Sequence, residues 1–247
     1  MSPQHNPQLL KALGIETRDF DYVVALAGNP NTGKSTVFNA LTGLRQHTGN
    51  WPGKTVSRAE GAFQFHDKKY KLVDLPGTYS LLSTSEDEEI ARNFILFGRP
   101  HCALVVVDAT CLERNLNLVL QILEITDKVV VALNLMDEAR RKKILIDPAQ
   151  LEQQLGVPVV PTTARTKEGI PELIKVTRAV IEGTRVTIPY RIQPPRAIED
   201  SVNQVTALLN ENYPGLPNAR WIALRLLDGD LSIRDAITSG EIEALTQ

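Results

Sequence analysis

The sequence has only two cysteines among its 247 residues, Cys102 and Cys111. Cys102 opens the apolar run CALVVVD, so we expect a buried thiol there, and reduced cysteines rather than a disulfide or a metal pair. The four histidines are scattered, and no cluster of His, Cys, Asp and Glu has the spacing of iron ligands. The sequence therefore predicts no iron site in this chain.

Long apolar runs and an excess of positive charge are also missing. No run of about 18 apolar residues occurs, and the N-terminus does not read as a secretion signal. Lys and Arg total 27 against 29 for Asp and Glu, which gives a net charge of -2. We therefore expect no membrane span and no nucleic-acid partner.

Short apolar runs alternate with helical patterns through most of the chain. Runs without polar alternation are typical of strands buried on both faces, and their alternation with helices predicts an α/β fold with a mainly parallel sheet. The turn residues HDKK predict a hairpin, and thus one antiparallel edge strand. The predicted strands cover residues 21–27, 70–74, 102–108, 128–134 and 157–164, and helices begin near Leu112 and Ile170.

The pattern changes after Gly183, where a proline-containing stretch without helical period is followed only by helical patterns. We divide the chain into an N-terminal extension (residues 1–20), an α/β domain (21–183), a linker (184–196) and a small all-helical domain (197–247).

The strongest motif is GNPNTGKST, which spans Gly28 to Thr36 between a strand and a helical pattern. This is the context of a phosphate-binding loop, in which glycines allow tight turns and backbone N–H groups point at the phosphates. Lys34 is expected to reach the β- and γ-phosphates, and the Ser35 hydroxyl to bind Mg²⁺. The other nucleotide-binding candidates of the loop are Asn29, Asn31, Thr32, Gly33 and Thr36.

Further motifs follow later strands. In DLPG, Asp74 is a candidate Mg²⁺ ligand, and the Gly77 N–H is a candidate γ-phosphate contact. In NLMD, Asp137 can accept from the two adjacent donors of guanine, which adenine lacks, so the motif predicts GTP rather than ATP. The supporting candidates are Asn134, which would brace the base and the loop, Met136, and Thr163 and Ala164, whose N–H groups would meet the guanine O6.

Residues 45–56, RQHTGNWPGKTV, are expected to form a mobile first switch. Thr55 is its candidate second Mg²⁺ ligand, and Gly53 is a nucleotide-binding candidate. Arg45 lies near this switch, in a loop expected to be mobile, so no arginine finger is assigned. For Trp51, a core anchor and a partly exposed side chain are both open. Thr78 stands where many nucleotide hydrolases carry a glutamine that holds the attacking water.

Together GNPNTGKST, NWPGKTV, VDLPGTYSL, ERN and NLMDEA resemble the cytosolic G domain of FeoB-type bacterial ferrous-iron transporters. The resemblance implies a P-loop GTPase fold, then a helical domain likened to a dissociation inhibitor, then a polytopic membrane domain that moves Fe²⁺. It places the chain at the cytoplasmic face of the bacterial inner membrane. It also implies homo-oligomers and small accessory transporter subunits as candidate partners.

The resemblance also suggests how GTP is hydrolysed. Members of that family lack the usual glutamine and hydrolyse GTP slowly. Their attacking water is held by main-chain groups, for which Thr55 and Gly77 are the candidates here. Some use K⁺, bound by a loop asparagine that matches Asn31 and by first-switch carbonyls around residues 49–51. Lys54, Ser57 and Thr163 depart from the family pattern, and Lys54 leaves the packing of the first switch open.

Other interpretations stay open at this point. A ribosome- or tRNA-associated GTPase shares GNPN.GKST and DLPG, but such proteins usually carry a basic RNA-binding module. A nucleotide-binding module without turnover is a further alternative. The acidic run EDEE, Glu86 to Glu89, fits a metal patch less well than the first turn of a helix after Ser85.

Overall fold

The computed structural model describes residues 7–43, 46–82 and 85–239. The chain divides into two compact units, Met1–Tyr190 and Arg191–Gln247. The boundary falls inside residues 184–196, the segment interpreted as a linker. No helix of the described residues is both long enough and apolar enough to cross a membrane.

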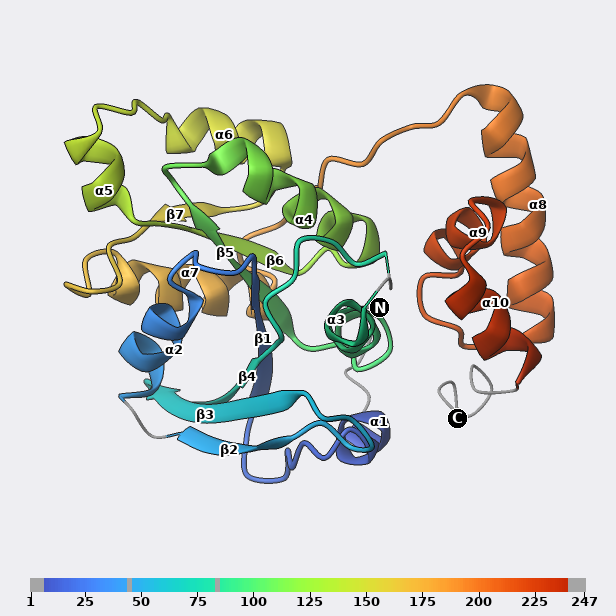
Figure 1. The fold of residues 1–247 in the computed structure, drawn as a ribbon, viewed down its shortest axis with the longest axis horizontal. Helices are drawn as coiled ribbons and strands as arrows, with labels where there is room; N and C mark the ends of the chain where they lie inside the picture. Colours follow the sequence, from blue (N-terminus) through green and yellow to red (C-terminus); the bar gives the residue numbers. More distant parts are fainter. Residues whose placement is uncertain (1–6, 44–45, 83–84, 240–247) are drawn as a thin grey trace. The chain divides into compact units, whose positions relative to one another are not determined.

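The first unit is built on a seven-stranded sheet in the order β2-β3-β4-β1-β5-β6-β7 (Figure 1). One strand, β3 (Ser57–Phe65), runs antiparallel to both of its neighbours, and every other pairing is parallel. The predicted fold is confirmed, with the outermost position beside β3 taken by β2. The remaining bounds are β1 (Tyr22–Gly28), β2 (Gln46–Asn50), β4 (Lys68–Asp74), β5 (Cys102–Asp108), β6 (Val129–Asn134) and β7 (Val159–Pro161).

The central strands are buried along nearly their whole length because their sequences are apolar on both faces. Every residue of β6 is buried, and in β5 only the terminal Asp108 is not. Polar side chains thus appear where the strands end: Asp74, Asp108 and Asn134 are the last residues of β4, β5 and β6. Parallel strands bring these ends to one edge of the sheet, where open α/β sheets bind ligands.

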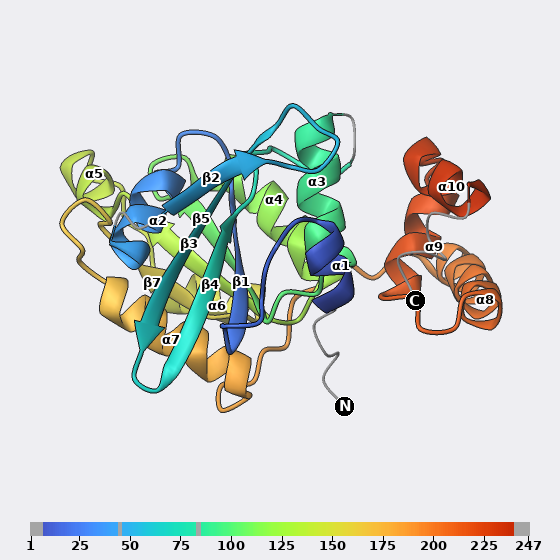
Figure 2. The ribbon, with the colours of Figure 1, turned by 90° about the horizontal axis from the view of Figure 1, so that it is seen from below.

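Helices cover both faces of the sheet (Figures 1 and 2). Helices α2 (Lys34–Thr42) and α7 (Ile170–Glu182) pack on one face, and α3 (Glu86–Leu96) and α4 (Leu112–Ile125) on the other. In α4 the buried Leu118, Val119 and Ile122 recur at helical spacing, so one stripe meets the sheet. The unit is completed by α1 (Pro7–Ala12), α5 (Met136–Arg141) and α6 (Pro148–Leu155).

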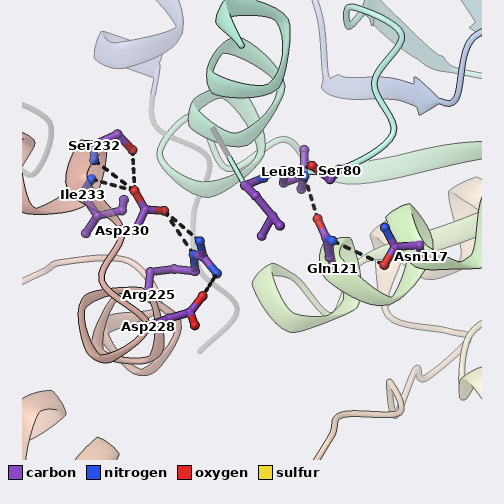
Figure 3. Close-up of polar contacts among 10 residues, drawn as sticks. Ser80, Leu81, Asn117, Gln121, Arg225, Asp228, Asp230, Ser232 and Ile233 are labelled. Carbon is purple, nitrogen blue, oxygen red and sulfur yellow. Dashed lines mark hydrogen bonds and ion pairs between the residues drawn. The ribbon is translucent and has the colours of Figure 1, made fainter. Parts of the chain in front are cut away.

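The second unit contains α8 (Arg196–Asn212), α9 (Ala219–Leu227) and α10 (Leu231–Thr238), as predicted for a small helical domain. Asp230 caps α10: one of its oxygens accepts from the N–H groups of Ser232 and Ile233, at 3.0 and 3.3 Å (Figure 3). Its other oxygen pairs with Arg225 of α9, at 3.1 Å. These contacts fix the turn between the last two helices.

Three local features differ from the expectations, and one alternative that the sequence left open is decided. Residues 46–50 of the predicted mobile loop form β2, because they pair with β3. The strand predicted over residues 157–164 is limited to Val159–Pro161. The N-terminal extension contains a helix, α1, that the sequence analysis did not predict. Trp51 is buried, with 2% of its surface exposed, so of the two alternatives the core anchor is correct and the partly exposed side chain is not.

The acidic run is the start of α3. The Ser85 hydroxyl accepts a hydrogen bond from Glu88 N at 3.3 Å, and all four acids fall in the first turn, where they complement the helix dipole. No group of three or more His, Cys, Asp or Glu residues with metal-binding geometry occurs in the described ranges.

Candidate functional site

The phosphate-binding loop connects β1 to α2 and is shaped by two left-handed residues. Asn31 has φ 66° and Gly33 has φ 80°. A Cβ on Gly33 would lie 2.4 Å from the Asn134 side-chain nitrogen, and a Cβ on Gly28 would lie 2.6 Å from the Val106 carbonyl oxygen. Both positions therefore require glycine, which explains the spacing of the motif in steric terms.

Lys34 begins α2 and points toward the end of β4. Its ammonium donates to the Asp74 carboxylate and, at 2.7 Å, to the Leu75 carbonyl oxygen. Burial raises the pKa of Asp74, and the Lys34 charge acts against this rise. The pair thus places a cation and an ionisable oxygen ligand side by side, as Mg²⁺-bound phosphates need.

Lys34, Asp74 and Gly77 line one pocket of about 230 Å³, together with Thr48, Arg58 and neighbouring residues of β3. The structure therefore brings together three of the predicted phosphate and metal residues. Ser35 lies exposed in the first turn of α2, and Thr55 lies exposed in the turn that follows β2. Neither of these two lines the pocket. Their hydroxyls and the Asp74 carboxylate are hard oxygen donors of the kind that Mg²⁺ prefers.

Asn134 braces the loop, as its position in NLMD predicts. Its side-chain nitrogen donates to the Thr32 carbonyl oxygen at 3.0 Å. Its side-chain oxygen accepts from Ala164 N at 3.1 Å and from the Thr162 hydroxyl at 3.2 Å. One buried amide thereby holds three segments together: the phosphate-binding loop, β6 and the turn after β7.

Asp137 lies beside this brace, at the start of α5. Its Oδ2 accepts from the exposed Arg165 at 3.2 Å. Its Oδ1 is buried and has no hydrogen-bond partner among the described residues. A buried acceptor without a donor costs free energy, of about 1–3 kcal/mol. The two adjacent donors of guanine would satisfy it, so this side chain fits the base.

The residues expected to meet the guanine O6 are placed differently. Thr163 N already donates to the Glu168 carbonyl oxygen at 3.0 Å, and Ala164 N donates to Asn134. An O6 contact from either N–H would have to be shared with these acceptors. Among the remaining candidates, Met136 follows Leu135 at the start of α5, and Thr36 is exposed on α2.

Asn29 is a buried member of the loop, with 2% of its surface exposed. Both polar atoms of its side chain lack hydrogen-bond partners among the described residues. Its main-chain oxygen accepts from the Thr32 hydroxyl at 2.9 Å. The side chain thus lies inside the loop, while Asn31 is on its exposed side.

Residues 75–82, which follow β4, are held by contacts with α3 and α4. Thr78 is buried, with 5% exposed, so its hydroxyl is not presented to solvent where a glutamine would hold water. The Ser80 hydroxyl donates to Glu88 at 2.6 Å. Leu81 N donates to the Gln121 side-chain oxygen, also at 2.6 Å (Figure 3). A Cβ on Gly77 would touch Pro30 of the phosphate-binding loop at 3.5 Å.

The first switch has contacts that the sequence did not reveal. Lys54 pairs with Glu89 of α3 at 3.1 Å, which explains how a lysine is accommodated at a position where the family pattern is apolar. Trp51 packs edge-on against Phe94 of α3, with ring centroids 5.7 Å apart. Gly53 is exposed in the turn between these residues, with φ 69°. Arg45 lies outside the described residues.

Comparison with known families now identifies the two units. The family model described as ferrous iron transport protein B matches residues 22–177, and the model of the FeoB cytosolic helical domain matches residues 195–247. The chain belongs to the FeoB family.

Curated relatives and solved structures agree. The chain is 42% identical over 215 residues to the Fe(2+) transporter FeoB of Escherichia coli strain K12, covering 85% of this chain and 27% of that protein. It is 43% identical over 212 residues to a Porphyromonas gingivalis Fe(2+) transport protein A/Fe(2+) transporter FeoB fusion protein, covering 84% of this chain and 25% of the relative. The chain thus spans about a quarter of the length of these relatives.

The cytosolic domain of L. pneumophila FeoB superimposes with a TM-score of 0.80 at 36% identity, covering 91% of this chain and 89% of that one. The T. maritima FeoB cytosolic domain in a GDP form superimposes with a TM-score of 0.80 at 37% identity, covering 92% and 86%. Both similarities include the G domain and the helical domain. The first unit therefore corresponds to the G domain of this family, and the second to its cytosolic helical domain.

Proposed function

We propose that this chain binds GTP, hydrolyses it slowly and passes its nucleotide state to a membrane domain that moves Fe²⁺. The observation that carries the proposal is the buried, unsatisfied Asp137 Oδ1 beside the Asn134 brace. Guanine offers donors to that oxygen and adenine offers none, so the site selects GTP and GDP. The same T. maritima domain has also been solved in a GMPPNP form, which supports binding of a triphosphate analogue.

Each phosphate-binding residue has a distinct task in this proposal. Lys34 leaves Asp74 and contacts the β- and γ-phosphates, while loop N–H groups from Gly28 to Ser35 surround them. Bound Mg²⁺ neutralises charge on the phosphate oxygens. The Ser35 and Thr55 hydroxyls and the Asp74 carboxylate would hold this ion.

We expect hydrolysis to be slow because Thr78 occupies the position after Gly77, where a glutamine would hold the attacking water. Thr78 is buried and carries only a short hydroxyl. Main-chain groups at Thr55 and Gly77 are left to orient the nucleophile. Asn31, exposed on the loop, contributes a neutral oxygen that suits a K⁺ ion beside the phosphates.

The rest of the proposal concerns partners. A polytopic membrane domain in the same full-length protein is the expected receiver of the signal, and this portion would lie at the cytoplasmic face of the bacterial inner membrane. The Porphyromonas gingivalis fusion, which joins transport protein A to FeoB, supports a small accessory subunit as a further partner. Homo-oligomers are also part of the proposal.

Phosphate release from GTP, measured with the purified chain and Mg²⁺, tests the hydrolytic half. We expect slow but measurable GTP turnover, and no ATP turnover. GTP binding without any phosphate release would instead identify a nucleotide-binding module.

The helical domain is proposed to slow GDP release. We expect a chain ending at Tyr190, the unit boundary, to release fluorescent GDP faster than the full chain. Equal rates from the two proteins would remove the inhibitor role and leave the GTPase assignment intact.

A further inference from the structure

The N-terminal segment, residues 7–20, is packed against the G domain although it lies before residue 22, where the family match begins. Leu10 and Ile15 are fully buried, with 0% and 1% exposed. Helix α1 lies beside α3, and Leu10 approaches Gly98 just after that helix (Figure 2). The segment therefore packs as an integral part of the first unit.

Arg58 of β3 is the point at which this segment reaches the G domain. One terminal nitrogen of its guanidinium donates to the Leu13 carbonyl oxygen at 2.7 Å. Its Nε pairs with Glu60 at 2.9 Å, and Glu60, only 5% exposed, also pairs with Lys71 at 2.5 Å. The Lys71 ammonium lies 5.1 Å from the Phe20 ring centroid. The network thus starts and ends in the N-terminal segment.

The same guanidinium lies against the first switch. Its central carbon is 5.6 Å from the ring centroid of Trp51, a cation–π distance. Trp51 N donates to the Val56 carbonyl oxygen at 3.0 Å, closing the turn that carries Thr55. Arg58 also lines the pocket that contains Lys34 and Asp74. One side chain therefore touches the N-terminal segment, the first switch and the phosphate-site pocket.

We propose that Arg58 is a positioning residue, through which the N-terminal segment holds the first switch in the arrangement described above. We call this set of contacts the clasp. The inference rests on the proposed function. In this arrangement Thr55 is exposed and does not line the pocket, so it must move to reach Mg²⁺ beside the γ-phosphate. That movement pulls Trp51 away from Arg58. Because the contact between these two residues exists only before the movement, it stabilises the present arrangement against the one in which Thr55 reaches Mg²⁺.

The clasp should favour binding of GDP over binding of GTP. GTP with Mg²⁺ recruits Thr55 and must break the clasp, whereas GDP lacks the phosphate that recruits it. Loosening the clasp should therefore strengthen binding of a GTP analogue more than binding of GDP. The coupling is reciprocal, so bound analogue should in turn loosen the N-terminal segment.

Gly14 offers a variant that acts on the clasp from the N-terminal segment. A Cβ on Gly14 would lie 2.5 Å from the Arg58 guanidinium, and the residue has φ 77°. Gly183 has φ 75°, and its Cβ would meet nothing within 4 Å. Gly14→Ala and Gly183→Ala thus add the same left-handed strain, but only the first displaces Arg58. Arg58→Lys is the second variant, because it keeps the charge and loses the planar fork.

The experiment uses the full chain with Trp221→Phe, which leaves Trp51 as the only tryptophan. Acrylamide quenching of Trp51 fluorescence in the nucleotide-free protein measures how accessible this side chain is, and so whether the clasp is closed. Titrations with GMPPNP and with GDP give the ratio of the two affinities. Gly14→Ala and Arg58→Lys should make Trp51 more quenchable and raise the preference for GMPPNP over GDP by about fivefold or more. Gly183→Ala should match the parent in both measurements.

Unchanged quenching and an unchanged affinity ratio in both variants would overturn the proposal. A ratio shifted toward GDP would overturn it too, since the segment would then support the GTP arrangement. If the parent bound no guanine nucleotide, the proposed function would fail, while quenching of Trp51 would still report on the clasp.

Discussion

The side-chain amide of Asn134 donates to the Thr32 carbonyl oxygen at 3.0 Å, so the residue that ends β6 holds the phosphate-binding loop from behind. The two residues are separated by 102 positions in the chain. The bond is buried, and the other end of the same amide is satisfied by Thr162 and Ala164. One buried amide therefore joins the phosphate-binding loop to the end of β6 and to the turn after β7.

Asn134→Ala should lower both stability and nucleotide affinity. It leaves the Thr32 oxygen and the Ala164 N–H without their buried partners, which costs about 1–3 kcal/mol of unfolding free energy for each unsatisfied group. We expect GDP affinity to fall by about tenfold or more, because the loop loses its brace. Urea unfolding and GDP titration measure the two effects.

Thr162→Val is the matched control for this prediction. It removes the hydroxyl that donates to the Asn134 side-chain oxygen and, at 3.4 Å, to the Leu133 carbonyl oxygen, and it leaves the bond to Thr32 in place. GDP binding should then stay close to that of the parent. A loss of affinity as large as that of Asn134→Ala would show that the link to the loop is not what matters.

Asp137→Asn should weaken GTP and favour xanthine nucleotides. The amide can donate to the xanthine C2 carbonyl, whereas guanine presents donors there, so GTP affinity should drop by about a hundredfold or more. Arg165→Gln removes the exposed partner of Oδ2 and spares the buried Oδ1, so it should change GTP affinity little. Competition between GTP and XTP measures both variants. Parent-like GTP binding by Asp137→Asn would rule out this base contact.

The predictable part of the site depended on local chemistry. Gly28, Gly33 and Lys34 sit in a short motif between a strand and a helix, and apolar runs located the strand ends that carry Asp74 and Asn134. The backbone of the loop and the sheet edge follow from steric and burial rules that act over a few residues. These features could therefore be read from the sequence.

The unpredicted part depended on packing across the chain. Arg58 meets Leu13 across 45 positions, and Lys54 meets Glu89 across 35. No local pattern specifies such partners, because they are set by how β3, α3 and the N-terminal segment fold together. Likewise, nothing in TTA shows that Thr163 N already donates to Glu168.

The helical domain should lose stability in acid through one ion pair. Arg220 of α9 donates to both carboxylate oxygens of Glu199 of α8, at 2.7 and 2.9 Å. This hydrogen bonding lowers the pKa of Glu199 from its ordinary 4.5, with desolvation acting in the opposite direction. A lowered carboxyl pKa contributes stability above the unfolded value, and this contribution is lost as pH falls through the folded value.

Arg220→Gln should therefore destabilise the helical domain near neutral pH and match the parent once Glu199 is protonated. Urea unfolding followed by Trp221 fluorescence, in a Trp51→Phe background, measures this at about pH 7 and about pH 3. Glu211→Gln alters an exposed glutamate on the same helix and should keep the parent's acid dependence. A deficit in Arg220→Gln that persists unchanged in acid would assign the effect to packing.

The last prediction concerns what takes the place of an arginine finger in GTP hydrolysis. Phosphoryl transfer builds charge on the phosphate oxygens, and an ion can stabilise it in place of an arginine finger. Asn31 is exposed on the loop with φ 66°, so its side-chain oxygen is free of the core that encloses Asn29. The candidate first-switch ligands are main-chain oxygens near Trp51. The Trp51 oxygen accepts from Lys54 N at 3.0 Å, so these groups must rearrange before they can bind K⁺.

We therefore expect K⁺ to speed GTP turnover and to affect GDP binding little. Turnover in KCl and in NaCl at equal ionic strength should differ by about tenfold, which is about 1.4 kcal/mol in the transition state. Asn31→Gly should abolish the difference while still binding nucleotide. Glycine is the cleaner substitution here because alanine would add strain at a positive φ. Equal parent rates in the two salts would mean that main-chain groups at Thr55 and Gly77 suffice without the ion. A K⁺ advantage that survives Asn31→Gly would place the ion elsewhere.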